Sequence, residues 1–531
     1  MKSEKLQLKI KDFLTKFKKE IWSYKLIYGL LLVILIFSAF FRLYRLDALL
    51  GFYYDQGRDA LKVQEILHFK DFPMVGPTTG IAGLFLGPFW YYLLAFVYFI
   101  SRGNPACASA LIGLFDVGTV FLLYWFGKEF YNRKIGLLAA FFWGFSYYLT
   151  RSARWFSNPS PLPFFTVLLL YALGMFFLKK REKYLILISV CLAISLQLEM
   201  ASAIFFIPSI ALMWLIFRPK INGKKNLFWA IGIFLIFLIP QFLFEIKNKF
   251  LMTKNFFSFN KGKINTDTSQ TWALPTIKFI KERMLAYFNI LFSKLETNPR
   301  LGSKFLAWLW LVFVTFQLVR QFFKKETSDR ATLILIIFLF LPLILLLFFV
   351  GNYGQLYDYY LTGFFPAFIL LFSLFAGFFL RKNLFSGGKS YLYWLVLSLI
   401  VVWFLSGNLP FLKNYLVAGV DGPTHITLGN QLQSIDWIYK DAKEEKFNVD
   451  VYVPPVIPYA YQYLFLWYGN KNYHRQPLAE NVPLLYVLYE VDPPHPERLD
   501  AWLARQDKIA ETIYSQKFGG IVVERRLRKN Q

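Results

Sequence analysis

The chain has 531 residues, 56% of them hydrophobic and 20% aromatic, and a formal net charge of +26 at pH 7. Soluble globular proteins contain about 45–50% apolar residues, so this composition excludes an ordinary soluble enzyme and indicates an integral membrane protein. The charge does not indicate a nucleic-acid partner, because the Lys and Arg residues are concentrated in short loops between apolar segments. That distribution is typical of loops retained in the cytoplasm.

Eleven apolar segments are long enough, or nearly so, to cross the hydrocarbon core of a bilayer. They lie at residues 26–46, 105–127, 134–150, 161–178, 184–200, 201–217, 226–246, 303–323, 331–350, 360–380 and 391–409. A further apolar segment at 81–101 contains two glycines and a proline, and we expect it to bend or to lie in the interface without crossing. With that choice the basic N-terminal arm, residues 1–25, and five basic loops all face the cytoplasm.

The same topology makes residues 26–409 a transmembrane domain with two long external loops, 47–104 and 247–302. Each loop contains a segment with the apolar spacing of an amphipathic helix, at 58–70 in the first loop and at 276–294 in the second. We expect both segments to lie on the membrane surface, where they would form the walls of a cavity.

From residue 410 onward the apolar runs shorten, and prolines and charged residues appear among them. We expect residues 410–531 to form a small extracytoplasmic α/β domain. Helices are predicted at 425–446 and 496–505, and strands at 447–453, 483–489 and 521–523. The predicted fold class is therefore a polytopic α-helical membrane protein with interfacial helices and a C-terminal α/β domain.

A charged motif at residues 51–59, GFYYDQGRD, follows directly on the first hydrophobic segment. Charges at a membrane boundary are costly unless they are solvated or paired, so they suggest a functional site. Asp55 is the candidate general base, which takes a proton from an attacking hydroxyl. Arg58 could bind phosphate or pair with a neighbouring carboxylate, and Asp59 could orient substrate or stabilise the start of a helix. An ordinary solvated loop would also explain these residues.

Further polar residues lie in turns on the same predicted side of the membrane. Arg151 and Arg154 have the planar guanidinium that suits phosphate oxygens, although snorkelling to lipid head groups would also explain them. Asn158 precedes a proline-rich helix start and is either a substrate ligand or an N-cap. Glu199, at the tip of a hairpin, could bind the acceptor or be solvated, and Tyr357 could stack on a sugar or belong to an aromatic belt.

The sequence predicts no cofactor. Its two cysteines, Cys107 and Cys191, lie in apolar segments, and its four histidines are scattered without the spacing of zinc ligands. Nothing in the sequence supports a bound divalent metal.

In their order along the chain, the basic arm, the first apolar segment, the acidic motif at 51–59, the aromatic segment at 81–101 and the external Arg-Asn-Pro turn resemble the C-type glycosyltransferases, which have the GT-C fold. The similar branch is that of the protein O-mannosyltransferases and the aminoarabinose transferase of lipid A, the family 39-like glycosyltransferases. The resemblance covers about residues 26–380. It implies that Asp55 is the acceptor-activating acid, with Gln56 in place of the family's glutamate.

Two departures from the family pattern bear on the site. Asn158 stands where the family's turn often carries Asp, and Glu199 stands where bacterial members often have His. These departures weaken the case for a metal and leave the acceptor open.

The residues and the resemblance together predict an inverting glycosyltransferase of the plasma membrane, with its N-terminus in the cytoplasm and its site outside. The donor would be a polyprenyl-phosphate sugar, and the acceptor a hydroxyl of a protein, lipid or glycan. Asp55 would act as base, Arg58, Arg151 and Arg154 would bind phosphate, and the other candidates would bind or orient substrate. Two other classes remain open: a lipid-linked sugar flippase or transporter, and a non-enzymatic scaffold for envelope assembly.

Overall fold

The computed structural model describes residues 15, 19–20, 22–260, 274–297, 301–323, 326–349, 355–378, 390–418, 422–454 and 457–529. Among these residues, eight helical segments are long and apolar enough to cross a membrane. They are formed by α2 (Lys25–Leu43), α6 (Pro105–Phe130), α11 and α12 (Met200–Ala203 and Phe206–Phe217), α13 (Lys224–Lys247), α16 (Leu301–Phe323), α17 (Thr327–Leu346), η2 and α18 (Asp358–Phe364 and Phe365–Phe378), and α19 (Ser390–Val417). The predicted polytopic helical fold is confirmed.

The other predicted crossings are shorter or interrupted. The segment expected at 134–150 is divided into α7 (Arg133–Gly144) and α8 (Tyr147–Arg154), because the Ser146 hydroxyl accepts a hydrogen bond from Leu149 N and caps a new helix. α9 (Leu162–Phe177) and α10 (Tyr184–Leu198) are apolar but have only 16 and 15 residues. The total of eleven crossings stays a prediction.

The segment expected not to cross is a loop followed by a short helix. Thr78 and Phe85 lie opposite each other across the loop, which is closed by backbone hydrogen bonds from Thr79 N to the Leu84 carbonyl and from Leu86 N to the Pro77 carbonyl. The helix that follows, α5 (Phe89–Ser101), has 13 residues. A helix of this length extends about 20 Å, whereas the hydrocarbon core is about 30 Å thick. The geometry therefore agrees with a bent segment that does not cross.

A buried ion pair holds three helices of the bundle together. Arg42 of α2 donates from Nε to the carboxylate of Asp116 on α6, and its other N–H groups donate to the backbone oxygens of Trp143 and Gly144 at the end of α7, at 3.3 and 3.0 Å. The Trp143 indole donates to the second Asp116 oxygen at 2.9 Å. Both charges are thus fully paired in an apolar interior, where an unpaired charge would be strongly destabilising.

The surface of α13 indicates the kind of solvent that surrounds the helical bundle. Ala230 is its one buried residue, whereas its large apolar side chains are exposed. These include Phe228, Trp229, Ile231, Leu235, Ile236, Ile239, Phe242, Leu243 and Ile246. An apolar helix surface of this extent is stable against lipid and not against water, so the chain is a multi-pass membrane protein.

Both amphipathic segments are helices. The first is α4 (Tyr54–Leu67), which begins four residues earlier than expected because the Gln56 side chain accepts a hydrogen bond from Tyr53 N and caps the helix start. The second is α15 (Ile277–Ser293), capped by Thr276. Two further short helices, α3 (Leu46–Leu49) and α14 (Leu251–Asn260), lie near them in the chain.

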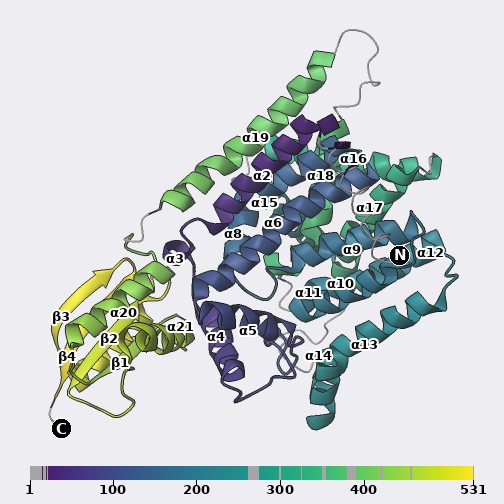
Figure 1. The fold of residues 1–531 in the computed structure, drawn as a ribbon. Helices are drawn as coiled ribbons and strands as arrows, with labels where there is room; N and C mark the ends of the chain where they lie inside the picture. Colours follow the sequence, from purple (N-terminus) through teal and green to yellow (C-terminus); the bar gives the residue numbers. More distant parts are fainter. Residues whose placement is uncertain are drawn as a thin grey trace.

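The C-terminal part is a four-stranded sheet with helices on both faces (Figure 1). Its strands are β1 (Phe447–Tyr452), β2 (Leu484–Glu490), β3 (Ala510–Phe518) and β4 (Ile521–Arg528), and its helices are α20 (Leu428–Ala442), α21 (Tyr459–Leu464), η3 (Phe465–Gly469), α22 (Asn470–Tyr473) and α23 (Pro496–Ile509). The strand order is β1-β2-β4-β3, with β1 parallel to β2 and the other pairs antiparallel. The small C-terminal α/β element is confirmed, while β3 and α21 were not predicted.

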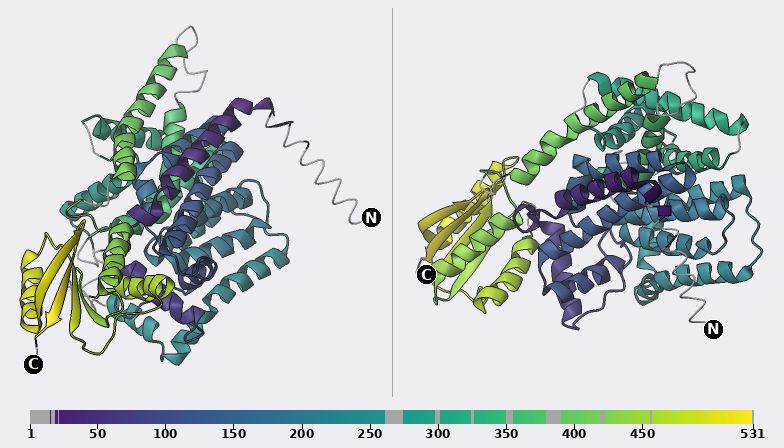
Figure 2. Two further views of the ribbon diagram at one scale, coloured as in Figure 1. Left: turned by 60° about the vertical axis from the view of Figure 1, so that its left-hand side comes forward. Right: turned by 45° about the horizontal axis from the view of Figure 1, so that its top comes forward.

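This C-terminal domain lies at one end of the helical bundle, against α3 and α4, in all three views (Figures 1 and 2). Leu428 N donates to the Leu50 carbonyl at 2.7 Å, and the Gln431 amide donates to the Phe52 carbonyl at 2.8 Å. At Gly57 of α4 the two parts touch through their backbones, since a Cβ there would lie 2.3 Å from Ala460 N of α21. The position of α4 is therefore set by the C-terminal domain.

The buried ion pair makes a stability prediction. Asp116→Ala leaves the Arg42 guanidinium buried without its carboxylate, which we expect to cost about 3–5 kcal/mol of stability. Thermal unfolding of the purified protein in detergent measures this loss. Lys278→Ala, which breaks the exposed Lys278–Glu282 pair, should leave the Tm almost unchanged. Equal Tm values for the two variants would contradict the assignment.

Candidate active site

A cavity of about 1330 Å³ opens where α4, the loop before α5, the α8–α9 turn, the α10–α11 break and the end of α15 meet. Five of the residues predicted from sequence line it: Asp55, Arg58, Arg151, Asn158 and Glu199. These residues come from three segments that are far apart in the chain: α4, the end of α8 with the turn after it, and the break after α10. Asp59, Arg154 and Tyr357 are not part of its wall.

The N-terminal turns of α4 contribute a charged group of residues to the cavity wall. Asp55 pairs with Arg58 at 2.9 Å, and the Asp55 side chain is 60% exposed, so its carboxylate is open to the cavity. Arg58 also pairs with Asp59 at 2.8 Å, and Asp59 is only 3% exposed. Spacings of three and four residues on a helix put all three side chains on one face.

Asp59 is the buried support of this group. It lies in the second turn of α4 and not at the helix start, and it accepts hydrogen bonds from Arg58 and, at 2.8 Å, from the indole of Trp90 on α5. Burial raises the pKa of Asp59 to about 6, although Arg58 opposes the shift. Burial lowers the pKa of Arg58, but the carboxylates of Asp59 and Asp55 outweigh it and raise that pKa above its ordinary value. Asp59 therefore orients Arg58, and Arg58 orients Asp55.

Gln56, which stands in the place of the family's glutamate, stabilises the start of α4. Gln56 is 1% exposed, caps α4 and donates to the Phe156 carbonyl at 3.2 Å. It does not reach the cavity. Of the two neighbouring motif residues, only Asp55 faces the space where a substrate would sit.

The two arginines of α8 have different surroundings. Arg151 lines the cavity and forms no ion pair with any described residue. Arg154 is buried and donates to the carbonyls of Phe41 and Tyr44 at 3.0 and 2.8 Å and to the Tyr415 hydroxyl at 3.1 Å. Its guanidinium donates hydrogen bonds to carbonyl groups at the C-terminal end of α2 and does not face the cavity.

Glu199 lies in the one-residue break between α10 and α11. Its carboxylate accepts a hydrogen bond from Ala201 N at 3.0 Å, and the Asn158 amide donates to the neighbouring Leu198 carbonyl at 2.6 Å. Burial raises the pKa of Glu199 to about 7. Asn158 thus supports the helix break, and Glu199 presents a carboxyl group that titrates near neutral pH.

Lys294, at the C-terminal end of α15, was not predicted as a site residue. It lines the cavity, is 4% exposed, and forms an ion pair with Asp358. Its ammonium lies 5.2 Å from the ring centre of Tyr148 and 4.7 Å from that of Phe365. Burial lowers its pKa, against the effect of Asp358. A lysine at a helix end ordinarily indicates only a favourable interaction with the helix dipole, so no local pattern predicts this burial.

The predicted aromatic residue is close to the cavity but outside it. Tyr357 precedes η2 and is 39% exposed. Its neighbours Tyr359 and Tyr360 line the cavity instead. The aromatic run therefore reaches the site through Tyr359 and Tyr360 and not through Tyr357.

The remaining wall is apolar, and part of it is open to the outside of the bundle. It includes Ile204, Phe205, Ile207, Phe256, Phe259, Leu345, Leu346 and Phe349. Ile204 and Ile207 are both more than two-fifths exposed. The cavity thus combines a charged end with an apolar side, as a lipid with a charged head group requires.

In the described part of the chain, no group of three or more His, Cys, Asp or Glu side chains lies close enough to hold a metal ion. The expectation of a reaction without a cofactor stays a prediction.

The raised pKa of Glu199 makes a prediction about pH. The folded protein keeps the proton up to about pH 7, whereas an unfolded Glu releases it near pH 4.5. The stabilising contribution is therefore complete below pH 4.5 and is lost as pH rises through 7, by an amount on the order of 3 kcal/mol. Glu199→Gln should make the Tm fall less steeply between pH 5 and pH 8 than in the unmodified protein. The exposed Glu282 provides the control, since Glu282→Gln should leave the profile unchanged; identical profiles for all three proteins would refute the assignment.

Comparisons with known proteins bear on the fold and the family of the chain. Residues 86–244 match the family model of dolichyl-phosphate-mannose-protein mannosyltransferases. The crystal structure of ArnT from Cupriavidus metallidurans bound to undecaprenyl phosphate is similar with a TM-score of 0.56 at 12% identity, over 95% of this chain and 98% of ArnT. Apo ArnT from the same organism gives 0.54 at 12% identity, over 96% and 98%. No curated protein sequence matches the chain.

At this identity the ArnT structures establish the fold, and the family match covers the segment that contains the α8–α9 turn and Glu199. The predicted resemblance to the GT-C glycosyltransferases of the family 39-like branch is confirmed, and with it the predicted enzyme class, a glycosyltransferase.

Proposed function

We propose that this chain is an inverting glycosyltransferase that moves a sugar from a polyprenyl-phosphate donor to an acceptor hydroxyl on the external face of the plasma membrane. The observation that carries the proposal is the position of Asp55. Its carboxylate is exposed in a cavity whose wall also contains cationic side chains and a large apolar part. A base, a phosphate site and a lipid site are thereby adjacent.

In the proposed reaction the acceptor hydroxyl attacks the anomeric carbon of the sugar from the side of Asp55. The carboxylate of Asp55 takes the hydroxyl proton as the new carbon–oxygen bond forms. The bond from the anomeric carbon to the phosphate oxygen breaks at the same time, and the polyprenyl phosphate leaves with the electron pair. Attack from the face opposite the leaving group inverts the anomeric configuration.

The departing phosphate gains negative charge, so cations near it stabilise the transition state. Arg151 is the first candidate, because it lines the cavity without an ion-pair partner in the described part of the chain. Lys294 is the second, since its buried ammonium has one carboxylate partner, the 57% exposed Asp358. Arg58 is already shared by two carboxylates, so we assign it to holding the base.

The apolar side of the cavity would hold the first part of the polyprenyl chain. Ile204 and Ile207 of this wall are exposed at the surface of the bundle, which gives the lipid a path from the bilayer. ArnT, whose fold is similar, has been crystallised with undecaprenyl phosphate. That complex supports a polyprenyl phosphate as the carrier here.

The external location is supported by the charges at the opposite end of the bundle. α7 and α8 run from the basic loop 128–134 to Arg151, and α10 runs from the basic loop 179–183 to Glu199. The two loops lie together, since Lys179 pairs with Glu129 at 3.4 Å. The positive-inside rule puts that end in the cytoplasm, and the cavity therefore on the external side.

Removing the base makes the central prediction. Asp55→Asn keeps the size of the side chain but cannot take a proton, so transfer from a labelled polyprenyl-phosphate sugar should fall by about a hundredfold or more. Glu65→Gln, at an exposed position of the same helix, should keep normal activity. Normal transfer by Asp55→Asn would eliminate the assignment, and movement of labelled lipid across vesicles without transfer would favour a flippase.

Lys294 gives a separate test of phosphate binding. Lys294→Met removes the ammonium but keeps the apolar stem, and we expect kcat/KM for the donor to fall by about tenfold to a hundredfold. Its former partner Asp358 is largely exposed, so the fold should remain stable. Lys278→Met on the same helix, 85% exposed, is the matched control. Equal kinetics for the two variants would show that Lys294 does not act on the phosphate.

A further inference from the structure

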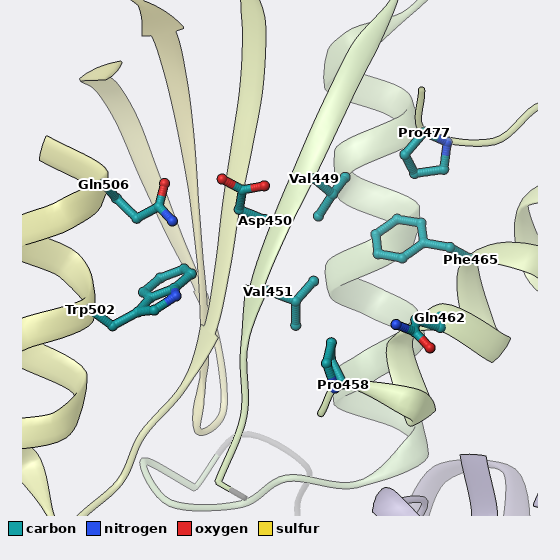
Figure 3. Close-up of a pocket in the computed structure, with 9 residues that line it drawn as sticks. All are labelled: Val449, Asp450, Val451, Pro458, Gln462, Phe465, Pro477, Trp502 and Gln506. Atoms are coloured by element: carbon teal, nitrogen blue, oxygen red, sulfur yellow. The ribbon is translucent and has the colours of Figure 1, made fainter. Parts of the chain in front are cut away.

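A second pocket, of about 470 Å³, lies in the C-terminal domain along the outer edge of β1. β1 is the first strand of the sheet, and among the described strands it pairs with β2 alone. Figure 3 shows the walls of the pocket: Trp502 and Gln506 of α23 stand on one side of the strand, and Phe465 and Gln462 stand on the other. The pocket therefore extends over the free edge of the sheet.

The backbone of β1 is available at this edge. The carbonyl of Phe447 accepts a hydrogen bond from Leu478 N, which lies outside the sheet. Since N–H and C=O groups of every second residue point to the same edge of a strand, those of Val449 and Val451 also point outward. Neither residue has a backbone hydrogen bond to another described segment outside the sheet. Both residues line the pocket.

Two side chains in the pocket also lack partners. The carboxylate of Asp450, on the side of α23 in Figure 3, forms no ion pair or hydrogen bond with a described residue. Gln506 is 6% exposed, and its Oε1 has no hydrogen-bond donor in the described part of the chain. A buried amide oxygen without a donor is unfavourable, so a ligand that supplies an N–H group would remove this penalty.

We propose that this pocket binds an extended polypeptide segment, which adds to the sheet as a fifth strand beside β1. The backbone of the segment pairs with Val449 and Val451, as in other cases of strand addition to an open sheet edge. Its alternate side chains enter the apolar space beside Phe465 and the space beside Trp502. A lysine or arginine of the segment faces Asp450, and a backbone or side-chain N–H group donates to Gln506.

The pocket adjoins the helix that supports the candidate active site. Gln462 of α21 lines the pocket, and Ala460 of the same helix touches Gly57 of α4. A bound segment would thus lie one helix away from the helix that carries Asp55. Binding at β1 does not depend on the proposed glycosyl transfer, and the test below measures binding alone.

The experiment uses the full-length protein in detergent and a short labelled peptide of alternating Val and Thr with a central Lys, with binding followed by fluorescence anisotropy. We expect saturable binding, and about a tenfold loss when the three central peptide nitrogens are methylated, because methylation removes the backbone donors. Asp450→Lys should lower the affinity for the Lys peptide by about tenfold. The same variant should bind a matched peptide with a central Glu more tightly than the unmodified protein does. Tighter binding of the Glu peptide also shows that the variant is folded.

The matched control is Glu511→Lys, an exposed carboxylate on β3 at the other edge of the sheet, which should change neither affinity by more than about twofold. Absence of saturable binding by the Lys peptide would overturn the proposal. Equal effects of Asp450→Lys and Glu511→Lys would also overturn it, since they would indicate attraction by net charge. Undiminished binding of the methylated peptide would show that no strand is added.

Discussion

The geometry of the candidate site depends on the burial of one carboxylate. Asp59 is enclosed by α4 and α5 and is paired with Arg58 and Trp90. Because Arg58 is fixed by this buried partner, its remaining N–H groups hold Asp55 at the cavity surface. Releasing Arg58 to a substrate would leave Asp59 buried without its cation, which is strongly unfavourable. Arg58 therefore supports Asp55, the proposed base, and in the proposed reaction Arg151 and Lys294 remain to bind the phosphate.

α4, the helix that carries Asp55, packs against the C-terminal domain on its other face. One face of α4 presents Asp55 to the cavity, while Gly57 lies against the backbone of α21. The hydrogen bonds from Leu428 and Gln431 to the residues before α4 fix the start of this unit. α4 is thus packed between the cavity and the C-terminal domain, which contributes no described residue to the cavity wall itself.

Much of this architecture could be predicted from the sequence because it follows from local patterns. The second amphipathic helix, predicted at 276–294, agrees closely with α15, since its apolar spacing and its Thr276 cap are both local features. The start of α4 was missed because the capping side chain, Gln56, lies inside the segment interpreted as a loop. β3 was missed because most of its side chains are exposed and polar, so it lacks the apolar alternation of a buried strand.

The site was harder to predict because burial is decided by distant residues. Arg151 and Arg154 lie one helical turn apart, and only the packing of α2 and Tyr415 against α8 turns Arg154 away from the cavity. Lys294 is buried by rings from Tyr148 and Phe365, which are remote in the chain. No spacing rule in one sequence contains this information. The carboxylates could be found because charges at a membrane boundary are unusual in themselves.

The contact at Gly57 has a consequence for how the two parts of the chain can be used. Since no side-chain atom fits between Gly57 and the backbone of α21, the C-terminal domain cannot be exchanged for one that lacks a helix at this position. A replacement domain would need a helix backbone in the position that α21 occupies. Otherwise α4 would tilt, and Asp55 would move away from the cavity. The two regions are therefore constrained to diverge together during evolution.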